Sequence, residues 1–265
     1  MLSPSIGREL EQIVGTDHVR RDALSLAAYG TDALKVGHPA DLVILPGSTR
    51  EIAAVARLCH EMRVPLVVRG AGTGYSGGAV PTAGGVVLSV ERLNRILDID
   101  EENLLAVVQP AVITGDLQAV VEARGLFYPP DPQSLKESSI GGNVAECAGG
   151  PRAFKYGVTK RYVLALQAVL PTGEIIRTGS KAVKNVVGYD LTQLLVGSEG
   201  TLAIITEITL RLIPKLPAVA TLRAWSSCST RWGRRRAMRS SCRRCRKWVE
   251  DSRITRGLRG GSIRG

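Results

Sequence analysis

The chain has 265 residues, of which 44% are hydrophobic, so it is long enough to bury one large core or two smaller ones. This composition excludes collagen-like, coiled-coil and wholly disordered classes. No run of about eighteen apolar residues predicts a membrane span, and the N-terminus lacks the basic and apolar regions of a signal peptide. We therefore expect a cytosolic globular protein.

The net charge of +11 is concentrated at the C-terminal end of the chain. Residues 221–265 contain thirteen Arg and one Lys against Glu250 and Asp251, whereas residues 1–220 contain 21 basic and 22 acidic side chains. All three Trp and three of the five Cys also lie in residues 221–265. The composition therefore changes near residue 220, and the net charge does not indicate a basic face on a folded domain.

The first predicted element is an amphipathic helix. Apolar residues follow Ile6 at the i+4, i+7 and i+8 positions of one helical face. Gly15 then stands where a glycine can end a helix. Residues 1–40 are accordingly expected to form an N-terminal helical segment.

A strand, a helix and a second strand are predicted next. Residues 42–45 are a short apolar run typical of a buried strand, and residues 66–68 are another. Between them, Ser48 and Glu51 form a capping box that opens a helix. The side chains expected on its inner face are Ile52, Val55, Ala56, Cys59 and Met62. Because parallel strands need such a crossover, the pattern predicts a strand-helix-strand unit.

The rest of the chain up to about residue 212 predicts more strands than helices. One helix is expected over residues 114–124, ended by Gly125. The expected strands are residues 85–90, 95–99, 104–109, 163–170, 174–178 and 202–212. Residues 128–157 are rich in Pro, Gly and Ser and too long for an idle connection, which favours a binding role. We expect an α+β protein with mixed sheets.

A glycine-rich loop follows the strand at residues 66–68. Residues 69–78 read Arg-Gly-Ala-Gly-Thr-Gly-Tyr-Ser-Gly-Gly, with five glycines in ten residues. Such a sequence lets several backbone N–H groups converge on one anion, as in a pyrophosphate site. The side chains of Arg69, Thr73 and Ser76 can add further donors.

The same loop allows two other interpretations. Gly72, Gly74 and Gly77 match the spacing of the dinucleotide fingerprint of nicotinamide-binding Rossmann folds, which must open a helix. Here residues 79–85 lead into another strand, which argues against that fold. The remaining alternative is a purely structural glycine-rich turn.

Two further loops have a similar character. Residues 138–145 place two serines before the pair Gly141 and Gly142 at an expected helix start, where free N–H groups attract negative charge and ring carbonyl oxygens. Residues 197–201, Gly-Ser-Glu-Gly-Thr, precede an apolar strand and can equally be an ordinary turn. An elongated cofactor would contact several such loops at once.

These loops resemble those of a known family. Residues 69–78, 140–150, 155–157, 188–191 and 197–201 are similar to motifs of the FAD-binding domain shared by vanillyl-alcohol oxidase, p-cresol methylhydroxylase and bacterial D-lactate and glycolate dehydrogenases. The resemblance covers roughly residues 25–215 and is strongest to the glycolate oxidase D-subunit type. It implies a p-cresol methylhydroxylase-type FAD-binding domain with two subdomains and mixed sheets flanked by helices.

The resemblance implies a cofactor site and a domain organisation. The FAD-binding domain would span residues 41–217, with subdomains 41–110 and 111–217. The pyrophosphate would lie on Arg69, Gly70, Ala71, Gly72, Thr73, Gly74, Tyr75 and Ser76. The ribityl chain and isoalloxazine would lie along Pro130, Asp131, Ser138, Ser139, Gly141, Gly142 and Asn143. The pocket would be completed by Gly149, Gly150, Tyr156, Gly157, Gly200 and Ile204.

The resemblance also predicts how FAD is attached, and this chain departs from the family's motifs at two positions. In relatives whose flavin is attached covalently through the first loop, a histidine stands at the position of Thr73, so non-covalent FAD is expected. Cys147 stands where close relatives often have Asn, and Ala203 where many have Gly. Cys147 is a candidate reactive thiol, although a buried small residue is the simpler interpretation. The three histidines show no metal-ligand spacing, so no metal site is expected.

The function implied is FAD-dependent oxidation of a small 2-hydroxy acid, such as glycolate or D-lactate, by hydride transfer to the flavin. The alternative is a non-catalytic FAD-binding fragment or a subunit that acts through partners, such as an iron-sulfur or second flavin subunit. A cytoplasmic location is expected, with attachment to the inner membrane through such partners only. The resemblance places the substrate anchor and base in a later capping domain, so no catalytic residue is assigned.

Residues 218–265 are predicted to be an irregular, disordered basic tail. A frameshift in a GC-rich gene explains the loss of both charge balance and family match there. The alternatives are a genuine arginine-rich segment that binds nucleic acid, and a metal site at Cys242 and Cys245, which lacks a second ligand pair at the usual spacing. No nucleic-acid partner is expected under the first interpretation.

Overall fold

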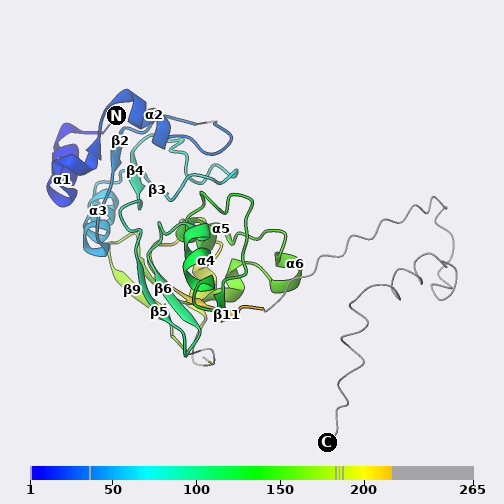
Figure 1. The fold of residues 1–265 in the computed structure, drawn as a ribbon. Helices are drawn as coiled ribbons and strands as arrows, with labels where there is room; N and C mark the ends of the chain where they lie inside the picture. Colours follow the sequence, from blue (N-terminus) through cyan, green and yellow to red (C-terminus); the bar gives the residue numbers. More distant parts are fainter. Residues whose placement is uncertain (1, 36, 183, 185, 187, 217–265) are drawn as a thin grey trace, which may run out of the picture. The chain divides into compact units, whose positions relative to one another are not determined.

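The computed structural model describes residues 2–35, 37–182, 184, 186 and 188–216 (Figure 1). The expectations for residues 218–265 therefore lie outside the described residues. The described residues up to 216 form one compact unit. In the part of the chain that the structure describes, no helix is long and apolar enough to cross a membrane.

A four-stranded sheet forms the N-terminal part of this unit. Its strands are β1 (Val19–Arg20), β2 (Leu42–Ile44), β3 (Leu66–Arg69) and β4 (Val86–Ser89), in the order β1-β2-β4-β3. β2 and β3 both run parallel to β4, which lies between them, and β1 pairs antiparallel with β2. The predicted strand-helix-strand crossover is confirmed: a helix connects β2 to β3. In the sheet, β4 lies between these two strands. The nominally helical first forty residues also contribute the edge strand β1.

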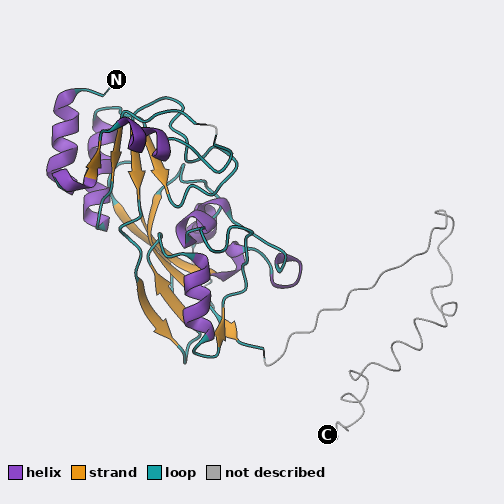
Figure 2. Ribbon diagram, turned by 45° about the horizontal axis from the view of Figure 1, so that its top comes forward, coloured by secondary structure: helices purple, strands orange, loops and turns teal. Residues whose placement is uncertain are grey.

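Helices cover both faces of this sheet (Figure 2). α1 (Pro4–Val14) and α3 (Thr49–Glu61) pack on one face, and α2 (Ala23–Tyr29) packs on the other. Every residue of β2 and β4 is consequently buried. This explains why these strands are continuous apolar runs rather than alternating ones, as expected for parallel strands covered on both sides.

The capping box of α3 forms as the sequence indicates. The Glu51 backbone N–H donates to Ser48 Oγ at 3.2 Å, and the Glu51 carboxylate accepts from the Gly47 N–H at 2.8 Å. Of the five side chains expected on the inner face, Met62 is the exception: it is 49% exposed. Met62 stands at the C-cap, one residue beyond the last turn of the helix, so the helical period no longer directs it to the core.

A five-stranded sheet forms the second part of the unit. Its strands are β5 (Ile96–Asp100), β6 (Leu105–Val108), β8 (Val163–Val169), β9 (Ile175–Gly179) and β10 (Ile204–Arg211). They lie in the order β5-β6-β10-β8-β9, and every neighbouring pair is antiparallel. The α+β class with helix-flanked sheets is confirmed, although this sheet is purely antiparallel and only the four-stranded sheet is mixed.

One core lies between this sheet and two helices, α4 (Thr114–Glu122) and α5 (Ile140–Glu146). Val169 of β8 and Ile204 of β10 belong instead to the core of the four-stranded sheet, so the ends of these strands join the two cores. The remaining elements are η1 (Thr16–His18), β7 (Leu126–Phe127), α6 (Ala153–Tyr156), η2 (Thr159–Tyr162), α7 (Leu191–Leu195) and β11 (Ile213–Pro214). Antiparallel pairing of β7 with β11 makes a small third sheet.

Candidate functional site

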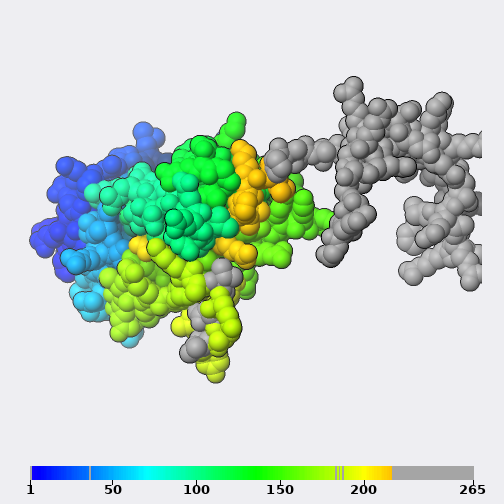
Figure 3. All heavy atoms as spheres, turned by 60° about the horizontal axis from the view of Figure 1, so that its bottom comes forward, coloured from blue at the N-terminus to red at the C-terminus, as the bar shows by residue number. Residues whose placement is uncertain are grey.

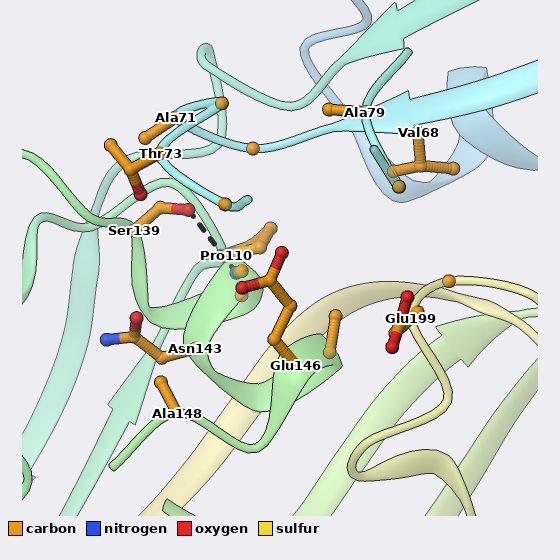
Figure 4. A pocket seen from close by; sticks show the side chains of 18 of the residues that line it. Val68, Ala71, Thr73, Ala79, Pro110, Ser139, Asn143, Glu146, Ala148 and Glu199 are labelled. Atoms are coloured by element: carbon orange, nitrogen blue, oxygen red, sulfur yellow. Dashed lines mark hydrogen bonds between the residues drawn. The ribbon is translucent and has the colours of Figure 1, made fainter. Parts of the chain in front are cut away.

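A cavity of about 350 Å³ lies where the three glycine-rich loops meet (Figure 4). Its wall comes from the loop after β3, from α5 and the residues that follow it, and from the loop before β10. These segments are far apart in sequence and belong to both sheets. The cavity is within the range of 300–1,000 Å³ that is usual for small-molecule and cofactor sites.

The loop after β3 supplies unpaired backbone donors. The N–H groups of residues 71–79 donate no hydrogen bond to any described residue. Gly72 and Gly77 have positive φ values of 69° and 81°, which an L-residue adopts only with strain. The loop leads through residues 79–85 directly into β4, so no helix opens there and the Rossmann interpretation is wrong. A run of free N–H groups beside a cavity is the arrangement that binds anions.

Arg69 was expected to contact the pyrophosphate, but its side chain lies elsewhere. It does not line the cavity. Its guanidinium donates to the carbonyl oxygens of Tyr29 and Thr31 and lies 5.8 Å from the centre of the Tyr29 ring. Together with the bond from the Ala33 N–H to the Gly74 oxygen, at 3.3 Å, Arg69 joins the N-terminal segment to the loop. The side chain therefore positions the loop rather than pointing into the cavity.

The glycine pair at the start of α5 acts through close packing. A Cβ at Gly141 would lie 2.5 Å from Pro110 Cβ and 3.0 Å from the Pro110 oxygen. A Cβ at Gly70 would lie 2.6 Å from Ser139 Oγ, so the loop after β3 packs directly against the N-cap side chain of α5. Glycine at these two positions lets α5 lie against Pro110 and lets the loop after β3 lie against Ser139.

The free N–H groups expected at the start of α5 are not free. The Gly141 N–H donates to the Pro110 oxygen at 2.7 Å, and the Gly142 N–H donates to Ser139 Oγ at 3.3 Å, the bond dashed in Figure 4. The Asn143 N–H donates to the Ser139 oxygen at 2.9 Å. The expectation of free N–H groups was wrong, because Ser139 and Pro110 already accept hydrogen bonds from the first N–H groups of the helix.

The third loop is fastened to α5. The Gly197 N–H donates to the Val144 oxygen at 3.0 Å, and the Glu199 N–H donates to the Ala145 oxygen at 2.8 Å. These bonds satisfy carbonyl groups at the C-terminal end of the helix and hold the loop against the cavity.

The structure brings most of the sequence-predicted site residues to this cavity. Those that line it are Gly70, Ala71, Gly72, Thr73, Gly74, Tyr75, Ser139, Gly141, Gly142, Asn143, Gly149, Gly150, Gly200 and Ile204. Those outside the lining are Arg69, Ser76, Pro130, Asp131, Ser138, Tyr156 and Gly157.

The predicted residues outside the lining include several that hold the surrounding chain. The Pro130 oxygen accepts from Gln118 Nε2 at 2.8 Å, and Asp131 Oδ1 accepts from the Arg152 N–H at 3.0 Å. Ser138 is buried, and its oxygen accepts from Thr114 Oγ1 at 2.9 Å. These hydrogen bonds fix the chain segments next to the cavity lining.

The family-like motif at residues 188–191 also lies away from the cavity. Tyr189 is 96% exposed. The described residues between β9 and α7, in yellow-green, project from the surface in Figure 3. Asp190 caps α7, because its Oδ1 accepts from the Gln193 N–H at 2.9 Å. The motif therefore starts a helix in this structure.

Sequence reasoning missed three carboxylates that line the cavity. They are Asp32 in the N-terminal segment, Glu146 at the end of α5 and Glu199 in the third loop. Desolvation raises the pKa of Glu146, with smaller contributions from the charges of Glu199 and Asp32. Glu146 and Glu199 lie inside the glycine motifs, so their place in the motifs could have marked them. Asp32 is far away in sequence, with no local signal.

The observations on this cavity fit an FAD cofactor. Free N–H groups beside the cavity can hold a pyrophosphate, and the glycines that line it leave the loop backbone open to a ligand.

Comparison with known proteins identifies relatives that are named as hydroxy-acid oxidases or dehydrogenases. The chain is 49% identical to glycolate oxidase subunit GlcD of Bacillus subtilis over 84% of its length, and 48% identical to D-lactate dehydrogenase of Anaerostipes hadrus over 69%. It spans only 48% and 38% of those two proteins.

Solved structures share the fold. An alkyldihydroxyacetonephosphate synthase superposes with a TM-score of 0.72 and 26% identity over 82% of this chain and 42% of that one. p-Cresol methylhydroxylase superposes with a TM-score of 0.70 and 20% identity over 82% and 45%, which bears on the fold alone. The expected p-cresol methylhydroxylase-type fold is thus confirmed. The sequence pattern of the FAD binding domain matches residues 40–179. The chain belongs to this family of FAD-binding domains.

Proposed function

We propose that the cavity binds FAD with its pyrophosphate on the backbone N–H groups of residues 71–79. The observation that carries this proposal is that none of these N–H groups has a partner among the described residues, although all of these residues except Ser76 line the cavity. Residues 72–74, 77 and 79 are half-buried, and half-buried donors without partners are costly, so an anionic ligand would satisfy them. The remaining predicted lining residues, on α5 and the third loop, would contact the rest of the cofactor.

The attachment is proposed to be non-covalent. Thr73 lines the cavity at the centre of the loop, and its hydroxyl cannot form the bond that a histidine forms at this position in covalent relatives. After acid precipitation of FAD-loaded protein, the yellow colour should therefore stay in the supernatant. Yellow colour in the washed pellet would contradict this attachment.

We propose that the domain serves the oxidation of a 2-hydroxy acid of the glycolate or D-lactate type. The support is the similarity to proteins named glycolate oxidase subunit and D-lactate dehydrogenase. When bound, FAD accepts a hydride from the substrate carbon. The residues of this chain hold the cofactor: the loop after β3 binds the phosphates, and α5 with the third loop orients the remainder. Residues 41–217 would form this domain, with subdomains 41–110 and 111–217.

The test is anaerobic addition of glycolate or D-lactate to the FAD-loaded chain. Bleaching of the flavin absorbance would support oxidation by this chain. FAD binding without bleaching would favour the alternative, an FAD-binding subunit that acts only with partners such as an iron-sulfur or second flavin subunit. Failure of the folded chain to bind FAD would contradict both.

A further inference from the structure

The cavity has an unexpected charge for an anion site. Three carboxylates line it, from Asp32, Glu146 and Glu199, and no Lys, Arg or His is among its described lining residues. The Arg69 guanidinium lies against the loop at Gly72, but it donates to the Tyr29 and Thr31 carbonyl groups and does not line the cavity. Attraction for a phosphate would therefore come from backbone N–H groups, against the repulsion of these carboxylates.

Glu146 is the carboxylate that lies closest to the middle of the loop. A Cβ at Gly74 would clash with Glu146 Oε1 and lie 3.1 Å from Glu146 Cδ, so the carboxylate lies against the loop backbone. Figure 4 shows the Glu146 carboxylate directed from α5 toward the loop after β3. The Glu146 carboxylate makes no hydrogen bond or ion pair with a described residue, although the Glu146 backbone belongs to α5. Its charge is therefore uncompensated at the place where the phosphates would lie.

The two other carboxylates have different surroundings. Asp32 Oδ1 accepts from the Leu34 N–H at 2.9 Å. Glu199 faces the end of the loop, where its Oε2 would be 3.8 Å from a Cβ at Gly78. Both add negative charge around Glu146, and after desolvation they are the contributors that raise its pKa. Glu146 is consequently the group on which a further negative charge acts most directly.

We infer that Glu146 takes up a proton from solvent when a diphosphate ligand binds in this cavity, so that this residue makes the affinity for FAD depend on pH. This inference rests on the proposed function. A bound pyrophosphate places negative charge beside the Glu146 carboxylate and disfavours its ionised form. The neutral carboxylic acid removes that repulsion and gains an O–H donor, which can bind a phosphate oxygen.

The direction of the pH dependence follows from linkage. The bound state holds the Glu146 proton to higher pH than the free state does, so affinity is greatest at low pH. Affinity then falls as pH rises between the two pKa values, by at most about tenfold per pH unit for one proton. Above the bound-state pKa the affinity becomes constant again.

The experiment measures the dissociation constant for FAD from the quenching of flavin fluorescence, at several values between about pH 5.5 and 8. The proteins are the wild type, Glu146→Gln and, as a control, Glu61→Gln, which removes an exposed carboxylate of α3 outside the cavity lining. We expect the wild-type and Glu61→Gln constants to rise about tenfold over this range. We expect Glu146→Gln to have a flat profile and to bind FAD about tenfold more tightly at pH 8.

Riboflavin, which lacks the pyrophosphate, should bind all three proteins without this slope. A slope that persists in Glu146→Gln, a flat wild-type profile, or an equal slope with riboflavin would each overturn the inference. These results differ from failure of the proposed function, in which folded wild-type protein binds no FAD at any pH. Circular dichroism of each variant checks that the fold is intact.

Discussion

Two glycine-rich segments face the same cavity and use glycine in opposite ways. In the loop after β3, the N–H groups of residues 71–79 are unpaired and the chain adopts positive φ at Gly72 and Gly77. At the start of α5, the N–H groups of Gly141 and Gly142 are already bonded within the protein. There the absence of side chains allows two backbone segments to touch. Glycine content alone therefore does not distinguish a ligand-binding loop from a packing contact.

The largest expected effect comes from filling the packing contact. In Gly141→Val, the new Cβ would meet both the side chain and the backbone of Pro110, which cannot move aside easily. Overpacking of this kind costs about 1–3 kcal/mol, so the midpoint of urea unfolding should fall clearly.

Gly142→Ala is the control for this change. Its Cβ would approach only Ser139 Oγ, at 3.1 Å, so the stability should change much less. Equal stability of the two variants would show that the approach to Pro110 does not constrain α5.

The sequence predicted the local elements of this molecule well. The continuous apolar runs of β2 and β3 and the Ser48 capping box depend on neighbouring residues, and each appears within one or two positions of its predicted bounds. The errors fall where local pattern ends. β1 has two residues, too few for a period, and Met62 lies just beyond its helix.

The site was predictable to a smaller extent, because it depends on contacts between distant segments. The glycine loops themselves mark the cavity, and most predicted residues line it. By contrast, the hydrogen bond from Ala33 to Gly74 and the burial of Asp32 arise only when the N-terminal segment folds over the loop. The satisfied N–H group of Gly141 was also invisible in sequence, because its partner Pro110 lies about thirty residues earlier.

A second pair of variants separates backbone strain from ligand binding. Gly77 in the loop and Gly125 after α4 have φ values of 81° and 74°, and a Cβ at either would meet no atom within 4 Å. Alanine at each position should therefore cost a similar amount of stability, roughly 1–2 kcal/mol, from the left-handed conformation alone.

Only Gly77→Ala should also weaken FAD binding, because the strain acts on the backbone that would hold the pyrophosphate. Thermal unfolding and FAD titration of both variants make the comparison. Equal FAD affinities in the two variants would mean that the conformation at Gly77 is not needed for the ligand.

The smallest expected effect is at the other end of α5. Cys147 follows the helix with φ 52° and ψ 46°, a left-handed conformation that Gly and Asn adopt more easily than Cys. Cys147→Asn should therefore stabilise the protein by about 0.5–1 kcal/mol, measured by urea unfolding. Since Cys147 does not line the cavity, FAD affinity should stay unchanged. A loss of stability would show instead that the partly buried thiol packs better in the core beside Gly197 than the amide does, and that packing outweighs backbone conformation at this helix end.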